Sequence, residues 1–268
     1  MTPQFRTGRG AAVLAAALAA VVLPSGIASY AVEKPSTHAA ATPTRADEPG
    51  DWTGDGLHLN AADNKKVDAY LVRARRAERT ISPQVRAAAR ISDAELVAFD
   101  HRLKSPDSLK RKVATDLKEH PQQRVEDALA HLNDAVRYTF QWPDGDYTRG
   151  VTIASDTLAL WGNANTKWTN TWGRELGYKG LNTGWREPRL GQKYEVQFHT
   201  PSSKHAQEVT HKLYEELRLP TTTARRKAEL QREQQEIFAS VPVPEGAAGL
   251  APPAGAPEAG DGALQDAA

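Results

Sequence analysis

Two polar side chains, Glu195 and Gln197, alternate with large apolar residues in a segment that is typical of a β-strand. Because successive side chains of a strand point to opposite faces, Glu195 and Gln197 share one face, and Tyr194, Val196 and Phe198 share the other. A carboxylate and an amide rarely lie together on an inner face, so we expect this face to meet a ligand or a metal ion. The alternative is an edge strand whose polar face meets water.

Basic residues gather around a predicted helix start. With one serine, the cluster comprises Arg102, Lys104, Ser108, Arg111 and Lys112. If a helix opens at Pro106 or Asp107, the first two approach from the preceding turn and the other three share a face. Backbone amides at a helix N-terminus and fixed cations both favour a polyphosphate. The alternative is a basic helix face that meets only water.

An aspartate, Asp134, stands at the start of a predicted strand over residues 135–142. Such an Asp can hold a divalent cation together with a Glu on a neighbouring strand. Two carboxylates and phosphate oxygens suit Mg²⁺, which binds few protein ligands and keeps several waters. Alternatively, Asp134 caps a turn and Arg137 pairs with an acid on the surface.

A tyrosine, Tyr178, lies between Gly177 and Gly180 at the start of another predicted strand. Its ring can present a stacking platform for a purine base. The alternative is a tyrosine that is packed into the turn. The packed turn tyrosine is the commoner fate of such a residue.

The elements that must position these groups are helices at both ends and strands between them. Helices are predicted from about residue 63, from Ser82-Pro83, and after a capping box formed by Ser92 and Glu95. Further strands are expected over 166–172, 180–185 and 194–200, and further helices over 151–161, 202–217 and 223–238. This order predicts an α+β fold with a mixed sheet of four or five strands flanked by helices.

The length of 268 residues suits one domain with additional segments at its ends. The start is typical of a secretory signal peptide, because Arg6 and Arg9 precede a short apolar run and Ser29-Tyr30-Ala31 offers a cleavage site. An uncleaved anchor is the alternative. We therefore expect a secreted, extracellular protein. Its predicted segments are a signal peptide (1–31), a flexible leader (32–56), a catalytic or binding domain (57–240) and a disordered tail (241–268).

Composition excludes several classes of chemistry and partner. The chain contains no cysteine, so disulfides, thiolate–metal sites and a Cys nucleophile are ruled out. A formal net charge of +1 gives no reason to expect duplex nucleic acid or, after signal cleavage, a membrane as partner. His199, His205 and His211 lack the i, i+4 spacing of a zinc-binding helix, and we interpret them as ordinary histidines.

In this order, the pieces resemble the synthetase domain of RelA/SpoT-type nucleotide pyrophosphokinases over roughly residues 63–218, and the secreted actinobacterial branch in particular. Lys104 to Lys112 is similar to the donor-phosphate motif of that family. Gly177 to Gly180 is similar to its Gly-Tyr acceptor-base motif, and Glu195-Val196-Gln197 to its Glu-x-Gln motif. The resemblance implies a RelA/SpoT synthetase fold of nucleotidyltransferase-like type.

The resemblance also implies a reaction. Such enzymes transfer the β,γ-pyrophosphate of ATP to the 3′-hydroxyl of a purine nucleotide such as ATP, ADP or GTP. The products are AMP and a nucleotide 3′-diphosphate such as pppApp. Mg²⁺ is the implied cofactor, and another divalent cation is the alternative. We expect the protein to be a monomer. The chemistry needs positioning and cations around spreading negative charge, which agrees with the residue types.

When the family motifs are matched to this chain residue by residue, the resemblance implies a role for each matched residue. The ATP phosphates would be held by Arg102, Lys104, Ser108, Arg111 and Lys112. Asp134 and Glu195 would hold Mg²⁺, and Glu195 would also take the proton from the 3′-hydroxyl. Tyr178 would stack on the acceptor base, and Gln197 would orient nucleotide groups. Lys167 on the donor side and Arg174 on the acceptor side fall where the family has phosphate-contacting residues.

Departures from the family pattern concentrate beside the acceptor. Leu176 replaces an Asn, and Asn182 replaces a His, so acceptor choice is expected to differ from the guanine preference of intracellular relatives and to include adenine. The spacing from Asp134 to Arg137 is also shorter than usual, which bears on the Asp assignment. No hydrolase pattern is present, which favours a synthesis-only, single-domain form.

Two other interpretations remain open. The first is a catalytically silent, secreted nucleotide- or RNA-binding domain that uses the same basic cluster without turnover. The second is a delivered toxin that depletes ATP in a competing cell by the same chemistry. The first would tolerate Glu195→Gln with little loss of function, whereas an enzyme would not.

Overall fold

The computed structural model describes residues 49–217, 219 and 221–254, and the expected signal peptide lies outside them. A five-stranded mixed sheet with the order β3-β4-β7-β6-β5 forms the centre. Its strands are β3 (Glu95–Val97), β4 (Arg137–Gln141), β5 (Ala164–Asn170), β6 (Leu181–Arg186) and β7 (Lys193–His199). Strands β4 and β7 are parallel, and the other neighbours are antiparallel. The predicted α+β class with a mixed sheet is confirmed.

The strand that carries Glu195 and Gln197 is the middle one of the five. Both side chains are buried, with 8% and 0% of the residue exposed. The alternative of a wet edge strand is therefore wrong, because β7 has a hydrogen-bonded neighbour on each side.

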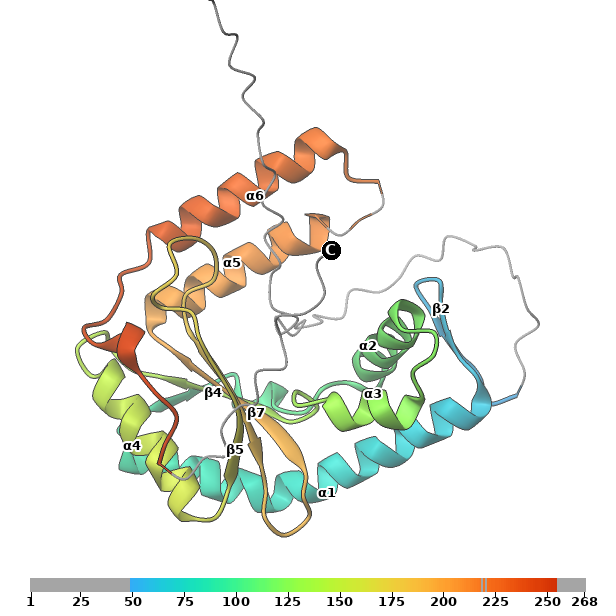
Figure 1. Cartoon of the computed structure of the whole chain (residues 1–268), viewed down its shortest axis with the longest axis horizontal. Helices are drawn as coiled ribbons and strands as arrows, with labels where there is room; N and C mark the ends of the chain where they lie inside the picture. The colour runs from blue at the N-terminus through green and yellow to red at the C-terminus, as the bar shows by residue number, and fades with distance from the viewer. Residues whose placement is uncertain (1–48, 218, 220, 255–268) are drawn as a thin grey trace, which may run out of the picture.

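Helices lie on both faces of the sheet, and further helices lie beyond one of its ends (Figure 1). They are α1 (Ala61–Ile91), α2 (Pro106–Glu119), α3 (Val125–His131), α4 (Tyr147–Leu160), α5 (Pro201–Leu217) and α6 (Ala224–Ala239), with 3₁₀ turns η1 (Phe99–His101) and η2 (Ala247–Gly249). The helix predicted over 151–161 is confirmed as part of α4, which begins four residues earlier.

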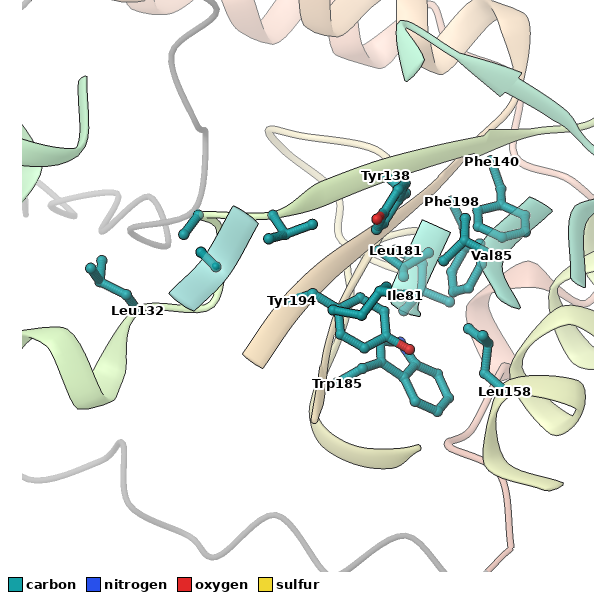
Figure 2. Close-up of a cluster of buried hydrophobic side chains, with 14 of the residues drawn as sticks. Ile81, Val85, Leu132, Tyr138, Phe140, Leu158, Leu181, Trp185, Tyr194 and Phe198 are labelled. Atoms are coloured by element: carbon teal, nitrogen blue, oxygen red, sulfur yellow. The ribbon is translucent and has the colours of Figure 1, made fainter. Parts of the chain in front are cut away.

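The apolar core lies between the sheet and helices α1 and α4. Figure 2 shows Ile81 and Val85 of α1 against Tyr138 and Phe198 of the sheet, with Leu158 of α4 beside them. Alternation along β4 and β7 sends these aromatic and aliphatic side chains to this face. The opposite face of the same strands is left with the polar residues.

The prediction that a second helix begins at Ser82-Pro83 is wrong, because α1 runs without a break from Ala61 to Ile91. Ile81 and Val85 are fully buried on either side of Pro83, so the apolar stripe continues through it. Pro83 itself is exposed, and water can satisfy the carbonyl that loses its helical partner. Tertiary burial outweighs the local helix-breaking signal.

The predicted capping box at Ser92 and Glu95 is also wrong. Asp93 adopts a left-handed conformation (φ 56°) that turns the chain. Glu95 to Val97 then pairs antiparallel with β4, which places Leu96 opposite Phe140. Long-range strand pairing decides this segment, and a capping motif does not.

The leader predicted to be flexible through residue 56 is ordered at its end. Strands β1 (Trp52–Gly54) and β2 (Leu57–Leu59) form a separate hairpin. It is held by Leu59, which is in the core, and by Trp52 Nε1, which donates to Asp107 Oδ1 at 3.1 Å on the first turn of α2. The hairpin therefore rests against the helix that was predicted to bind phosphate.

The tail predicted to be disordered from residue 241 packs against the domain as far as residue 254. Val241 and Ala247 are buried, and Leu250 packs on the core. Asn170 Nδ2 donates to Ala247 O at 2.8 Å, and Trp168 Nε1 to Leu250 O at 3.0 Å. These contacts hold the segment along edge strand β5, which the Pro- and Ala-rich composition does not reveal.

Within the described ranges, none of the helices has the length and apolar character that crossing a bilayer requires.

Candidate functional site

One face of the sheet collects the polar side chains in register. Across four strands, one row consists of Arg137, Glu195, Gly184 and Lys167, and the next consists of Thr139, Gln197, Asn182 and Thr169. Residues paired in this way have side chains on the same face. We call these two rows the polar face. It is the surface that the alternation of Glu195 and Gln197 predicted.

Asp134 lies at the edge of the polar face between two lysines. Lys104 Nζ is 2.9 Å from Asp134 Oδ2, and Lys112 Nζ is 2.9 Å from Asp134 Oδ1. Burial by itself would raise the pKa of Asp134, but Lys104 and then Lys112 outweigh it and hold the pKa well below its usual range. The structure therefore brings Lys104, Lys112 and Asp134 together, with the carboxylate ionised.

The other members of the basic cluster, Arg102, Ser108 and Arg111, do not share one environment. Helix α2 begins at Pro106 as predicted, and Ser108 is buried in its first turn. Arg102 Nε contacts Glu78 Oε1 at 2.5 Å, and Arg111 Nε contacts Asp55 Oδ2 of the β1–β2 hairpin at 2.6 Å. Both guanidinium groups are held by carboxylates at the margin, so phosphate binding by either would compete with an ion pair.

Glu195 lies on β7 directly opposite Arg137 of β4, and Gln197 Nε2 donates to Glu195 Oε1 at 2.5 Å. Burial raises the pKa of Glu195. Arg137 opposes this and Asp134 adds to it, and the net direction is upward. A buried carboxylate with a raised pKa is a better proton acceptor than an ordinary surface glutamate.

The donor atoms around these carboxylates fit a hard divalent cation that completes its shell elsewhere. Buried Asn133 Oδ1 and Thr166 Oγ1 have no hydrogen-bond partner among the described residues. A Cβ on Gly184 would lie 3.0 Å from Thr166 Oγ1 and 3.6 Å from the Asn133 side chain, so the missing side chain leaves this space open. The described ranges contain no group of three or more His, Cys, Asp or Glu suited to a metal. Asp134 and Glu195 therefore suit a cation that takes its other ligands from phosphate oxygens and water.

Tyr178 does not present an open ring. It is 4% exposed, and Phe238 of α6 and His199 of β7 pack against it edge-on with ring centroids 5.8 Å away in both cases. The prediction of an open stacking platform is wrong in this structure, and the alternative of a packed turn tyrosine describes it. The cause is tertiary, because Phe238 comes from a helix 60 residues downstream.

The Tyr178 hydroxyl belongs to a chain of hydrogen bonds that runs in one direction. Tyr178 Oη donates to Asn182 Oδ1 at 3.0 Å and lies 3.0 Å from His199 Nε2. Since its single proton goes to Asn182, His199 Nε2 must be the donor and Nδ1 the acceptor. Ser203 Oγ lies 2.9 Å from His199 Nδ1 and 3.2 Å from Thr200 O, so its single proton is shared between these two acceptors. This chain fixes the neutral tautomer of His199 and the side-chain orientation of Asn182.

The buried His199 predicts an acid-sensitive fold. Burial lowers the pKa of His199 well below its usual value, and Lys204 and Arg137 add to this. Between about pH 6.5 and 5 the unfolded chain binds a proton at this position that the folded chain does not bind, so stability falls with the pH. We expect His199 to account for about 2 kcal/mol of that loss in unfolding free energy.

Denaturant unfolding at pH 7, 6 and 5 measures this effect. His199→Gln should lose less stability than the unaltered protein over this interval, whatever its stability at pH 7. His205→Gln is the matched control, because His205 is exposed on α5. Identical pH dependence in the unaltered protein and in His199→Gln would contradict a neutral His199.

The remaining predicted site residues divide into two groups. Lys167 lies in register on the polar face with an exposed side chain, and Gln197 is buried there. Arg174 is exposed in the loop between β5 and β6, and its backbone carbonyl accepts a hydrogen bond from Lys179. The structure brings Lys167 and Gln197 to the site, but it shows no side-chain contact of Arg174 with the polar face.

Sequence reasoning missed several polar-face residues. Arg137, suggested only as a partner for a surface acid, is 9% exposed and lies opposite Glu195. Arg137 and Thr139 alternate with Tyr138 and Phe140 as Glu195 does with its neighbours, so the same periodicity was available to find them. His199 was interpreted as ordinary and is fully buried.

Helix α5 adds two residues that no local pattern reveals. Gln207 Nε2 donates to Gln197 Oε1 at 3.4 Å, and Lys204 Nζ donates to Gln207 Oε1 at 2.7 Å. Lys204 is only 3% exposed, although polar residues of an amphipathic helix usually face water. The site therefore has a buried cation on the α5 side as well as on the α2 side.

Comparisons with known proteins find a likeness only among solved structures. No protein-family model matches the chain, and no curated protein matches it. Among solved structures, it is similar to the small alarmone synthetase 1 of Bacillus subtilis, whose crystal structure holds its product pppGpp. The two are 14% identical, the match covers 65% of this chain and 91% of that chain, and the TM-score is 0.47. At this distance, the function of the chain has to be argued from its own residues.

Proposed function

We propose that the protein is a secreted, Mg²⁺-dependent transferase that moves the β,γ-pyrophosphate of ATP to the 3′-hydroxyl of a purine nucleotide. The observation that carries the proposal is the ionised, buried Asp134 between Lys104 and Lys112, next to Glu195 with its raised pKa. Fixed cations for phosphate and a carboxylate able to accept a proton are the two requirements of this reaction. Secretion rests on the sequence of residues 1–31.

The donor phosphates are proposed to lie at the start of α2. Lys104 and Lys112 approach from there, and Ser108 lies in the first turn, where backbone amides favour an anion. Arg102 and Arg111 are the outer cations, each of which would exchange a carboxylate partner for phosphate. Lys167 on β5 is a further proposed contact of the ATP phosphates, and Lys204 on α5 adds positive charge beside Gln207.

The transfer step needs one proton acceptor. The 3′-oxygen of the acceptor forms a bond to the β-phosphorus of ATP, and the bond from that phosphorus to the α,β-bridging oxygen breaks, so AMP leaves. Glu195 takes the hydroxyl proton as the new bond forms. Arg137, directly opposite Glu195, keeps the carboxylate in place and is available to stabilise negative charge on the transferred group.

Mg²⁺, when bound, would neutralise phosphate charge and would be held by Asp134 and Glu195, with Asn133 Oδ1 as a further oxygen donor. A lysine that now contacts Asp134 would then be released to phosphate. Each oxygen of Asp134 already contacts one lysine, so the carboxylate cannot bind a cation as well without weakening at least one of these contacts. Lys104 and Lys112 are therefore the groups that we expect to move when substrate binds.

The acceptor base is proposed to contact Asn182 on the polar face. The hydrogen bond from Tyr178 fixes Asn182 Oδ1 as an acceptor, so the amide nitrogen of Asn182 remains to donate to the base. Tyr178 then acts by orienting Asn182, and it stacks on a base only if Phe238 moves away. Arg174 remains a proposal for the acceptor phosphates.

Mass spectrometry of the protein incubated with ATP and Mg²⁺ tests the proposal. AMP together with an ATP heavier by one pyrophosphate would support both the reaction and an adenine acceptor. AMP together with a GTP heavier by one pyrophosphate, formed only when GTP is added, would keep the reaction class and restrict the acceptor to guanine. If a folded protein binds ATP but forms no product with any purine nucleotide, the proposal is wrong and a silent binding domain is favoured.

A further inference from the structure

A cavity lies between α1, the end of α3 and the turn from β6 to β7. Its volume is about 310 Å³, which falls near the lower end of the usual range for small-molecule sites, about 300–1,000 Å³. Its lining includes Arg73 and Arg76 of α1, Lys193 of β7, and the apolar side chains Leu129, Leu132 and Leu190. We call it the α1–α3 cavity.

The cations of the α1–α3 cavity have no acidic counterpart. No carboxylate is among its lining residues, and none of the ion pairs in the described part of the chain involves Arg73, Arg76 or Lys193. The acid of the adjoining turn, Glu187, is completely buried and accepts a hydrogen bond from the Leu190 backbone N–H at 2.6 Å. Arg73, Arg76 and Lys193 therefore share the α1–α3 cavity, and no carboxylate in its lining neutralises their charge.

Lys193 is the best-anchored of the three. Its Nζ donates to Ala130 O at the end of α3, at 2.7 Å, and retains two further N–H groups. Arg186 of β6 is the register partner of Lys193, so the two cations lie side by side, and an anion bound at Lys193 would relieve their repulsion.

The aromatic residue of the lining, Tyr70, is held by two hydrogen bonds. Tyr70 Oη accepts a hydrogen bond from Gln192 Nε2 at 3.1 Å and donates to Leu132 O at 3.4 Å. The Arg73 guanidinium lies 5.6 Å from the centre of the Tyr70 ring. Leu132 precedes Asp134 by two residues, and Lys193 precedes Glu195 by two, so the cavity backs onto the segments that carry both carboxylates.

We propose that the α1–α3 cavity is a second ligand site, which binds a small phosphorylated molecule with at least two negative charges. The phosphates would be held by Arg73, Arg76 and Lys193, since guanidinium groups bind phosphate in a bidentate manner. An apolar or planar part would lie against Leu129, Leu132 and Leu190. The proposal is independent of the reaction proposed for the polar face.

Calorimetric titration of the full chain with ADP and, separately, with inorganic pyrophosphate tests the site. The double variant Arg73→Gln/Arg76→Gln should lower the affinity of one class of ADP site by at least about tenfold. The matched control is Arg75→Gln/Arg79→Gln, which removes the same charge from exposed positions of the same helix that do not line the cavity. It should bind ADP unchanged. Pyrophosphate should bind more weakly than ADP, because it lacks the apolar part.

The variant Lys104→Ala distinguishes ADP binding in the α1–α3 cavity from ADP binding at the polar face. In this variant the class of ADP site that depends on Arg73 and Arg76 should persist, whether or not the protein has transferase activity. The proposal is overturned if Arg73→Gln/Arg76→Gln binds ADP like the unaltered protein, or if both double variants lose affinity equally, which would indicate diffuse attraction. It is also overturned if Lys104→Ala removes all ADP binding, or if the unaltered protein binds ADP more weakly than about 1 mM.

Discussion

Glu195→Gln is expected to reduce transfer of pyrophosphate from ATP by about 10²- to 10⁴-fold, the usual contribution of a positioned general base. The amide is nearly isosteric with the carboxylate but cannot accept the hydroxyl proton. The burial that raises the pKa of Glu195 makes a neutral side chain no less stable at this position. We therefore expect the thermal midpoint to stay the same or rise while product formation is lost.

Product formation measured by mass spectrometry, together with the thermal midpoint, checks this prediction. Glu233→Gln is a suitable control, because Glu233 is an exposed glutamate on α6. Turnover close to normal in Glu195→Gln would refute the assignment of Glu195 as proton acceptor. If instead ATP binding itself is lost, the main role of Glu195 is to hold the cation.

Lys104→Ala is expected to lower kcat/KM for ATP by about 10- to 150-fold, which corresponds to the loss of one charge-assisted phosphate contact of about 1.5–3 kcal/mol. Lys104 is nearly buried, with 9% of its side chain exposed, and contacts Asp134 at 2.9 Å. A flexible surface lysine could be replaced by its neighbours. A lysine buried at this position has no substitute except Lys112.

Lys110→Ala is the matched control for this experiment. Lys110 also lies on α2 and also forms an ion pair, with Asp68 at 2.8 Å, but away from the polar face. It should leave the KM for ATP unchanged. If Lys104→Ala lowers only the thermal midpoint and leaves the kinetics with ATP unchanged, Lys104 is a structural partner of Asp134 and the phosphate role is wrong.

Much of the candidate site was predictable from local pattern because strand periodicity is a local property. The alternation of Glu195 and Gln197 with aromatic and aliphatic residues identified the face, and the Pro106 start of α2 identified the helix N-terminus. These features depend on side chains only a few residues apart, which the chain brings together in any context. Pairing of Asp134 with Lys104, in contrast, joins residues 30 positions apart.

The sequence alone determined the order of most elements, the polar face and the composition of the basic cluster. The tertiary structure decided which polar groups have partners. It placed Arg111 against Asp55, covered Tyr178 with Phe238, carried α1 through Pro83 and held the segment after α6 on β5. Each of these outcomes depends on burial or pairing between distant segments, where packing outweighs local propensity. Periodicity and turn chemistry therefore determined the elements, and contacts between distant segments determined what each side chain is free to bind.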